Sequence, residues 1–307
     1  MRVLVTGAEG FVGNVLLARL RARGAEAIAT DRADLDVADE TRVHAAVAAA
    51  QPDAVVHLAA ISFVPEAEAD GGRAFRVNYL GTRNVLAAVA ASAPRARVLL
   101  VSSSTVYGPA AAGAPPFEES SALRPANAYA RTKAAADLLG AAFAERGLAV
   151  WRARPWNHTG AGRPERFVES SFARQLAEIE AGRRPPRIEV GALDSVRDFL
   201  HVEDVVDAYL ALLEGKAKPG AYNVASGSGV TIRALLERLL AQTRVSPELV
   251  VDPARLRPPD ASVGSAARLR ALTGWAPRRT LDAALAELLE DWRRRIRSES
   301  GRMAALP

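Results

Sequence analysis

The chain has 307 residues, of which 49% are apolar and 24% charged, and its net charge is +5. These values are typical of a soluble globular protein with one large domain, with or without a smaller lobe. Because there is no cysteine, disulfides, thiol catalysis and cysteine-based metal sites are excluded. No apolar run reaches the roughly 18 residues that span a bilayer, and Met1-Arg2 leads straight into a short strand without a signal-peptide pattern. We therefore expect a cytoplasmic protein with no membrane partner.

Arginine dominates the positive charge, because lysine contributes only 3 of the 40 basic residues. The arginines are scattered rather than aligned on one helix face, so we expect no nucleic-acid partner. A positive balance nevertheless suits a polyanionic small molecule. No histidine or carboxylate cluster has the spacing of metal ligands, and we expect no metal.

Short apolar strands alternate with helices through the first half of the chain. Val3-Leu4-Val5 predicts a buried strand, and a glycine-rich turn leads into a helix from about Gly13 to Arg23. Further strands are predicted at 27–30, 54–58, 98–102 and 149–153, with helices at 41–50, 74–91 and 128–146. This alternation predicts an α/β fold with a doubly wound parallel Rossmann sheet covered on both faces.

The pattern changes after Arg154-Pro155, where loops lengthen and prolines cluster. Amphipathic helices are predicted at 231–242 and 281–297, and residues 299–307 are predicted to fray. We expect a dinucleotide-binding Rossmann domain over 1–155 and about 196–226. A smaller α+β substrate lobe would take 156–195 and 227–307.

The turn after the first strand reads Thr6-Gly7-Ala8-Glu9-Gly10-Phe11-Val12-Gly13. Gly7 allows a tight turn, Gly10 lets backbone approach a pyrophosphate, and Gly13 lets helix and strand pack closely. The helix N-terminus then presents unpaired N–H groups to phosphates. With an acid at the end of the second strand, Asp31, this context predicts a dinucleotide site.

Two neighbouring residues give opposite indications of whether the cofactor is NAD(H) or NADP(H). Asp31 can accept hydrogen bonds from ribose hydroxyls, which favours NAD(H), whereas Arg32 could pair with a 2′-phosphate, which favours NADP(H). Glu9 would repel an added phosphate if it points inward.

Tyr129 and Lys133 are four residues apart, so on a helix they share a face. We expect the ammonium to lower the pKa of the phenol, which would make Tyr129 a proton donor or acceptor.

The Gly-x-x-Gly-x-x-Gly spacing and Tyr129-x-x-x-Lys133 resemble motifs of the short-chain dehydrogenase/reductase superfamily, and the length indicates its extended branch. That resemblance implies that Tyr129 is catalytic and that Lys133 binds the nicotinamide ribose. It further implies cofactor contacts from Asp36, Val37, Leu58, Ala59, Ala60 and Asn78.

The Ser102-Ser103-Ser104-Thr105-Val106-Tyr107-Gly108 segment follows the fourth strand. In the extended branch, the Ser or Thr four residues before this Tyr binds the reacting oxygen, and that position is Ser103. Thr105 occupies the slot where related 4,6-dehydratases carry a Glu that eliminates water. The resemblance therefore implies a reductase or an epimerase, with Thr105 beside the substrate.

The Asn157-His158 pair is similar to GDP-mannose 4,6-dehydratases and GDP-4-dehydro-6-deoxy-mannose reductases, and the segments 167–182 and 190–199 look much more like the reductases. The pattern departs at Trp156 and Ala161, where Phe and Pro are usual. The resemblance implies substrate contacts from Asn157, His158 and Arg174, with Arg197 and Arg257 on the pyrophosphate. We expect a reductase that forms GDP-6-deoxy-D-mannose from a GDP-linked sugar. The alternative is a UDP-galactose-type 4-epimerase with tightly held NAD.

The helices predicted at 74–91 and 128–146 are rich in Ala and Leu. In this family their outer faces build a four-helix bundle between subunits, so we expect a homodimer.

Overall fold

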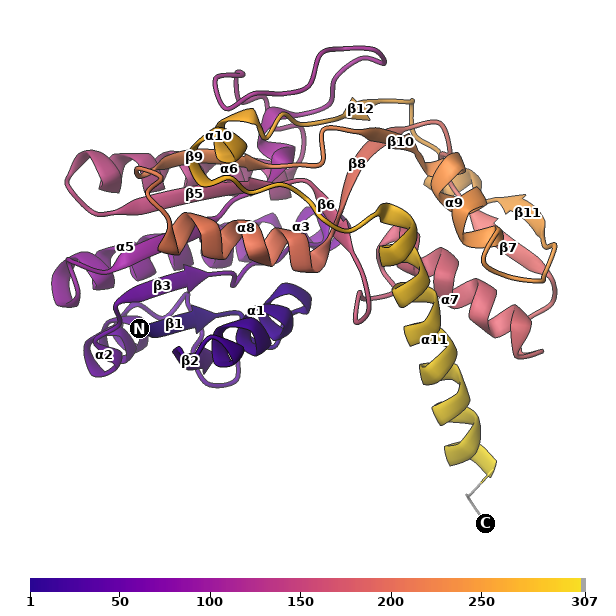
Figure 1. Ribbon diagram of the computed structural model, residues 1–307, viewed down its shortest axis with the longest axis horizontal. Coiled ribbons are helices and arrows are strands. Elements are labelled where there is room, and N and C mark those ends of the chain that lie inside the picture. Colours follow the sequence, from indigo (N-terminus) through magenta and orange to yellow (C-terminus); the bar gives the residue numbers. More distant parts are fainter. Residues whose placement is uncertain (305–307) are drawn as a thin grey trace.

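A computed structural model describes residues 1–304, with side chains described as far as residue 299. Its main sheet has six parallel strands in the order β2-β1-β3-β4-β5-β9 (Figure 1). They are β1 (Arg2–Thr6), β2 (Glu26–Thr30), β3 (Ala54–His57), β4 (Arg97–Val101), β5 (Val150–Pro155) and β9 (Gly220–Val224). The chain runs from β1 outward to β2 and then back to β3 on the other side of β1. This reversal creates the switch point where ligands bind at the carboxyl edge of such sheets.

Alternate side chains of the sheet pack on two opposite helix layers. Val3 and Val5 share a core with helices α1 (Phe11–Ala22) and α8 (Val202–Glu214). Leu4 belongs to the core on the other face, with α2 (Glu40–Ala50), α5 (Gly81–Ser92) and α6 (Ala128–Glu145). A period of two along a strand produces this division. The predicted doubly wound α/β fold is confirmed.

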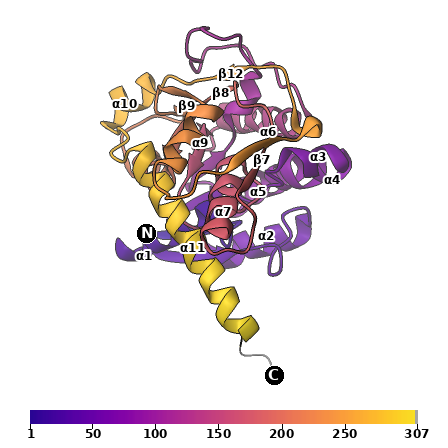
Figure 2. The ribbon, with the colours of Figure 1, turned by 90° about the vertical axis from the view of Figure 1, so that its right-hand side faces the viewer.

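A smaller lobe lies beside the main sheet (Figures 1 and 2) and has a hydrophobic core of its own. Apolar side chains of three helices and two strands meet there, including Leu176, Ile188, Phe199, Leu235 and Leu288. The elements of this lobe are α7 (Val168–Glu180), β7 (Arg187–Val190), α9 (Ile232–Leu240), β11 (Glu248–Val251), the short turn η3 (Pro253–Arg255) and α11 (Leu281–Ala304). No helix in the described part of the chain is long and apolar enough to cross a bilayer.

Two segments lie in different places from those predicted. The strand β8 (Val196–His201) does not join the main sheet but pairs with β6 (Asn157–Thr159), β10 (Gly229–Thr231) and β12 (Ala261–Ser262). Conversely, α10 (Ala267–Thr273) packs on the main domain, because Leu269 and Trp275 are buried in the core beside α8.

The helix predicted at 74–91 is interrupted. The chain forms α3 (Val64–Ala69), which was not predicted, then α4 (Gly71–Phe75), a π-helical turn η1 (Arg76–Leu80) and α5. Such turns are rare and are often found at functional sites. At the other end of the chain, α11 continues to Ala304. The prediction that the chain frays from residue 299 is therefore wrong for residues 299–304. Residues 305–307 lie outside the described part.

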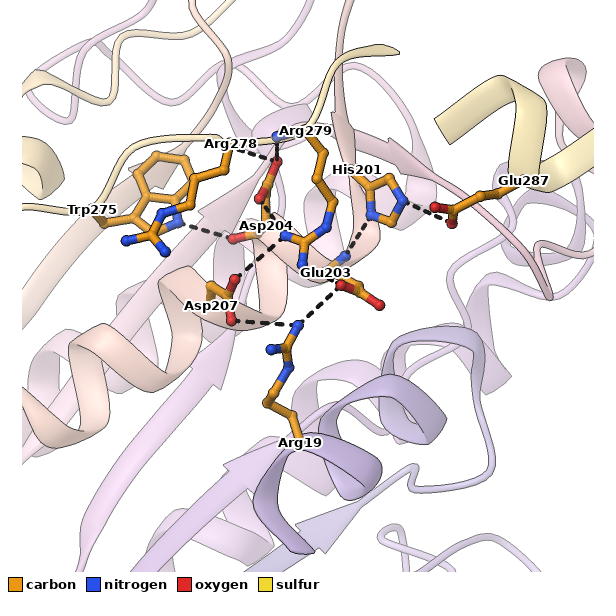
Figure 3. Close-up of polar contacts among 9 residues, drawn as sticks. All are labelled: Arg19, His201, Glu203, Asp204, Asp207, Trp275, Arg278, Arg279 and Glu287. Atoms are coloured by element: carbon orange, nitrogen blue, oxygen red, sulfur yellow. Dashed lines mark hydrogen bonds and ion pairs between the residues drawn. The ribbon is translucent and has the colours of Figure 1, made fainter. Parts of the chain in front are cut away.

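A charged cluster fastens the small lobe to the main domain (Figure 3). The buried Asp204 carboxylate on α8 accepts hydrogen bonds from the backbone N–H groups of Arg278 and Arg279, at 3.1 and 2.9 Å, and from the Arg279 side chain at 2.8 Å. His201 adds a 2.9 Å contact to Glu287 on α11. The segment leading into α11 is thereby fixed to α8.

Candidate functional site

The glycine turn after β1 has a shape that only glycine permits. Gly7 has φ +72°, and a Cβ there would lie 2.7 Å from the Ala59 backbone nitrogen. At Gly13, a Cβ would lie 2.4 Å from the carbonyl oxygen of Ala8. The turn therefore brings the N-terminus of α1 against the ends of β1 and β3, with Gly10 at the helix cap. Its first-turn N–H groups have no acceptors within the helix, which suits an anionic ligand.

This turn lines a cavity of about 1040 Å³, the first cleft. Nearly all predicted cofactor residues line it: Gly7, Gly10, Phe11, Val12, Gly13, Asp31, Arg32, Asp36, Val37, Leu58, Ala59, Ala60, Tyr129 and Lys133. Asp31 accepts hydrogen bonds from the N–H groups of Glu9 (2.8 Å) and Arg32 (2.7 Å), so it also fixes the turn. The turn has the backbone shape and the cleft has the size that a dinucleotide requires.

Asn78 is placed differently from the prediction. Its side chain is fully buried in the π-helical turn and is not part of the cleft lining. It accepts a 2.8 Å bond from the Ile61 N–H and donates to the Ile61 carbonyl (3.1 Å) and the Thr132 hydroxyl (3.0 Å). Through these bonds Asn78 braces the loop after β3 against α6, and we infer that it supports the cofactor site without contacting the cofactor.

Three predicted catalytic side chains meet at the inner end of the first cleft. Asn127 caps α6 by accepting a 2.8 Å bond from the Ala130 N–H, so the helix begins just before Tyr129 and carries Lys133 one turn later. Ser103 follows β4 and caps the short turn η2 (Ser104–Tyr107). Its Oγ accepts hydrogen bonds from the Thr105 N–H (3.2 Å) and hydroxyl (2.9 Å).

The electrostatics of Tyr129 differ from those predicted. Burial raises the pKa of the phenol above 10, and a hydrogen bond with Ser103 and the charge of Arg163 partly oppose this. The Lys133 ammonium does not provide the opposing charge. It donates a 2.5 Å hydrogen bond to the carbonyl oxygen of Val101, and burial lowers the pKa of Lys133 to about 8.

A second cavity of about 1220 Å³, the second cleft, continues from the first, since seven residues line both: Phe63, Pro65, Asn157, Arg163, Arg166, Phe167 and Val168. Seven arginines and five carboxylates line the second cleft, so its net charge favours an anionic ligand.

The three predicted substrate arginines all line the second cleft. Arg197 pairs with both Asp260 oxygens, at 2.8 and 3.0 Å. Arg174 pairs with Glu165 and, at 2.8 Å, with Glu178. Arg257 is exposed, and its side chain donates only to backbone carbonyls within the described residues, those of Ala254 and Leu256.

Asn157 and His158 lie on β6, just after β5; Asn157 lines both clefts and His158 lines the first. Asn157 donates a 3.2 Å hydrogen bond to the Asp198 carbonyl. His158 Nδ1 lies 2.9 Å from the Trp156 carbonyl, so Nδ1 carries the hydrogen. The ring stacks on Phe11 with centroids 6.0 Å apart, and burial lowers the pKa of His158 to about 4, so it is neutral at pH 7.

Comparison with known proteins identifies the family. The model of the NAD dependent epimerase/dehydratase family matches residues 3–225. The chain belongs to that family. It is 41% identical over 304 residues to GDP-6-deoxy-D-mannose reductase of Pseudomonas aeruginosa, a match that covers 97% of this chain and 99% of the relative.

Solved structures agree with this membership. The structure of RMD from Pseudomonas aeruginosa complexed with NADPH superposes with a TM-score of 0.89 and 38% identity, covering 96% of this chain and all of the other. Thermus thermophilus UDP-glucose 4-epimerase complexed with NAD superposes with a TM-score of 0.86 and 27% identity, covering 95% and 99% of the two chains. The predicted family is confirmed, and with it a dinucleotide-dependent oxidoreductase.

Two charged residues near the reacting centre of this epimerase/dehydratase fold were not predicted from the sequence. Asp137 on α6 is fully buried, and pairs with Arg152 and Arg154 at 2.8 Å each beneath Lys133. Arg163 is buried beside Tyr129. The i+4 spacing from Lys133 to Asp137 was a usable signal, but Arg163 had none in so arginine-rich a chain.

Proposed function

We propose that this chain uses NAD(P)H to reduce the C4 ketone of GDP-4-dehydro-6-deoxy-D-mannose, giving GDP-6-deoxy-D-mannose. One observation carries the proposal: Ser103, Tyr129 and Lys133 converge in a cleft that the glycine turn begins and that opens directly into an arginine-lined cleft. The 41% identity to a reductase of that name, over nearly the whole chain, supports the substrate.

Each catalytic side chain has a distinct task in this proposal. Ser103 orients the ketone oxygen by hydrogen bonding, while Tyr129 donates the proton that the developing alkoxide needs. Lys133 uses one N–H for Val101 and keeps two for the nicotinamide ribose hydroxyls. The bound nicotinamide cofactor supplies the hydride. Holding the two reactants together in one cleft supplies much of the remaining rate enhancement.

The second cleft would hold the GDP part of the substrate. Arg197 and Arg257 line this cleft and would bind the pyrophosphate, for which a guanidinium fork is well suited, and Arg174 would add positive charge. Asn157, which lines both clefts, and His158, which lines the first, would contact the sugar. A neutral His158 offers Nε2 as a hydrogen-bond acceptor for a sugar hydroxyl.

Thr105 argues against a dehydratase. Its hydroxyl donates to Ser103, so it organises the catalytic serine, and a threonine cannot act as a base for the elimination of water at neutral pH.

The proposal is tested by supplying the 4-keto-6-deoxy GDP-sugar with NADPH or NADH and following nicotinamide absorbance. We expect oxidation of the cofactor, and Tyr129→Phe should reduce turnover by about 10²–10⁴-fold. NMR of the product reads the configuration at C4, either rhamno or talo. No oxidation of either cofactor, together with copurified NAD and interconversion of a UDP-sugar, would establish the epimerase instead.

A homodimer and a cytoplasmic location are part of the proposal. Leu138 on α6 is 58% exposed and Phe75 on the adjoining α4 is 44% exposed, where they present apolar surface to solvent. Light scattering should give about twice the 32.5 kDa chain mass, and Leu138→Asp should lower it. Leu272→Asp, at a leucine on α10 that is 49% exposed, should leave the mass unchanged. Cell fractionation tests the location.

A further inference from the structure

Arg163 is a buried arginine at the junction of the two clefts. Its Nε donates a 3.0 Å hydrogen bond to Glu169, itself only 2% exposed. The guanidinium carbon lies 3.5 Å from the centroid of the Phe167 ring and 5.3 Å from that of Phe11. One edge of the guanidinium is therefore paired and its flat faces are covered by aromatic rings.

The other edge of the guanidinium is open to a ligand. Within the described residues, Nη1 and Nη2 of Arg163 donate no hydrogen bond, and the side chain lines both clefts. Neither nitrogen is among the buried side-chain atoms that lack a partner, so both reach the cleft space, where a ligand can accept from them. Among the described residues that line both clefts, only Arg163 combines a buried side chain with unused donors.

The backbone of Arg163 is fastened on both sides to α11 of the small lobe. The Gly162 N–H donates to Asp291 at 2.9 Å. The Arg163 carbonyl accepts from the Ser170 hydroxyl at 2.8 Å, and that hydroxyl accepts from the Trp292 indole at 2.9 Å. The guanidinium is thus held in place before any ligand arrives, as specific recognition requires.

We propose that Arg163 binds the sugar ring of the substrate, donating from Nη1 and Nη2 to its ketone or hydroxyl oxygens next to Tyr129. This inference rests on the proposed function, because it assumes that a nucleotide sugar spans the two clefts. Arg163 would also stabilise the Tyr129 phenolate that remains after proton transfer. It would be a substrate-binding residue separate from the arginines on the pyrophosphate.

The charges around Tyr129 agree with this arrangement. Ser103 contacts the phenol from the loop after β4, and the Arg163 charge opposes the effect of burial on the pKa of Tyr129. Four other groups act on this pair: Tyr209 on α8, His158 on β6, Glu169 on α7 and Arg166 just before α7. Lys133 on α6 lines the same cleft. Glu169 partly balances the Arg163 charge, and Arg163→Gln would leave Glu169 unpaired.

Binding measurements on full-length protein test the sugar contact. Calorimetry should show Arg163→Gln binding GDP-mannose about 10- to 100-fold more weakly than wild type, with GDP affinity unchanged. Arg257→Gln should lower the affinity for both ligands alike. Arg233 is exposed and lines neither cleft, so Arg233→Gln should leave both affinities unchanged. An unchanged ratio of the two affinities in Arg163→Gln would overturn the inference. Wild type is assayed for reduction of the keto sugar in parallel. If wild type reduces the keto sugar and the ratio is still unchanged, the inference about Arg163 fails while the proposed function stands.

The ionisation of Tyr129 gives a second readout that needs no turnover. The tyrosinate absorbance that disappears in Tyr129→Phe reports this phenol, and in the Arg163→Gln background it should develop at higher pH. Arg163→Lys keeps the charge but loses the fork, so it should restore the ionisation but not the affinity for GDP-mannose. Identical titrations in Arg163→Gln and wild type would contradict the role beside Tyr129.

Discussion

The Lys133 ammonium donates a 2.5 Å hydrogen bond to the Val101 carbonyl at the end of β4. Lys133 is 3% exposed, and burial lowers its pKa from 10.5 to about 8, although the charge of Asp137 opposes this. At pH 7 the folded chain therefore holds a protonated lysine in a place that disfavours the charge. The ammonium also lines the first cleft, so its charge is available to a ligand there.

We predict that the stability cost of this buried charge disappears at high pH. Between pH 8 and 10.5 the unfolded chain binds the Lys133 proton more tightly than the folded chain, so the free energy of unfolding rises with pH by about 3 kcal/mol over this window. Lys133→Met lacks this group. Its stability relative to wild type should therefore fall by the same amount between pH 8 and 10.5, as measured by urea unfolding. Parallel pH profiles for the two proteins would contradict the prediction.

The positions of the catalytic groups were predictable because they depend on local sequence. Strand, glycine turn and helix follow from periodicity and from Gly7 and Gly13, and parallel strands bring their carboxyl ends to one edge. Tyr129 and Lys133 follow from helical spacing. These features need no knowledge of distant contacts.

The parts that were not predicted depend on tertiary contacts. The strand β8 joins the small sheet because β6 and β10, far from it in the sequence, offer it partners. Arg163 is distinguished from the other arginines only by Glu169, Phe167 and α11, which meet it in space. The direction of the shift in the pKa of Tyr129 was predicted wrongly because helical spacing does not show that the phenol is buried, which is the largest cause of the shift.

Asn78 is predicted to support the site without touching the cofactor. Asn78→Ala leaves the buried N–H and carbonyl of Ile61 without partners, which should cost about 2–4 kcal/mol of unfolding free energy. Turnover should fall, because the loop after β3 and α6 lose their brace. Affinity for NADPH, measured on fully folded protein by fluorescence, should stay within about threefold. A loss of cofactor affinity far beyond this would show a direct contact.

Arg32 is predicted to decide between the two cofactors. It is exposed and lines the first cleft beside Asp31, where a 2′-phosphate would lie. Arg32→Ala should lower the affinity for NADPH by about tenfold, the value of one charge-assisted hydrogen bond. The affinity for NADH should be unchanged. Arg42→Ala, at an exposed arginine that does not line the cleft, serves as the control. Equal losses for NADH and NADPH would place the Arg32 contact elsewhere on the dinucleotide.

Asp204 is predicted to be the main fastening between the lobes (Figure 3). Its carboxylate is 1% exposed and accepts from two backbone N–H groups and Arg279. Asp204→Asn replaces an acceptor oxygen with a donor and leaves the Arg279 charge short of a partner, so the unfolding free energy should drop by about 3 kcal/mol. Asp207→Asn is the matched control on the same helix. It removes ion pairs of 3.5 and 3.8 Å at a carboxylate that is 24% exposed, which should cost under about 1 kcal/mol. Because α11 holds the loop of Arg163, Asp204→Asn should also lower the affinity for GDP-mannose more than the affinity for GDP. Equal stability losses in the two variants would show that the cluster acts only through its total charge.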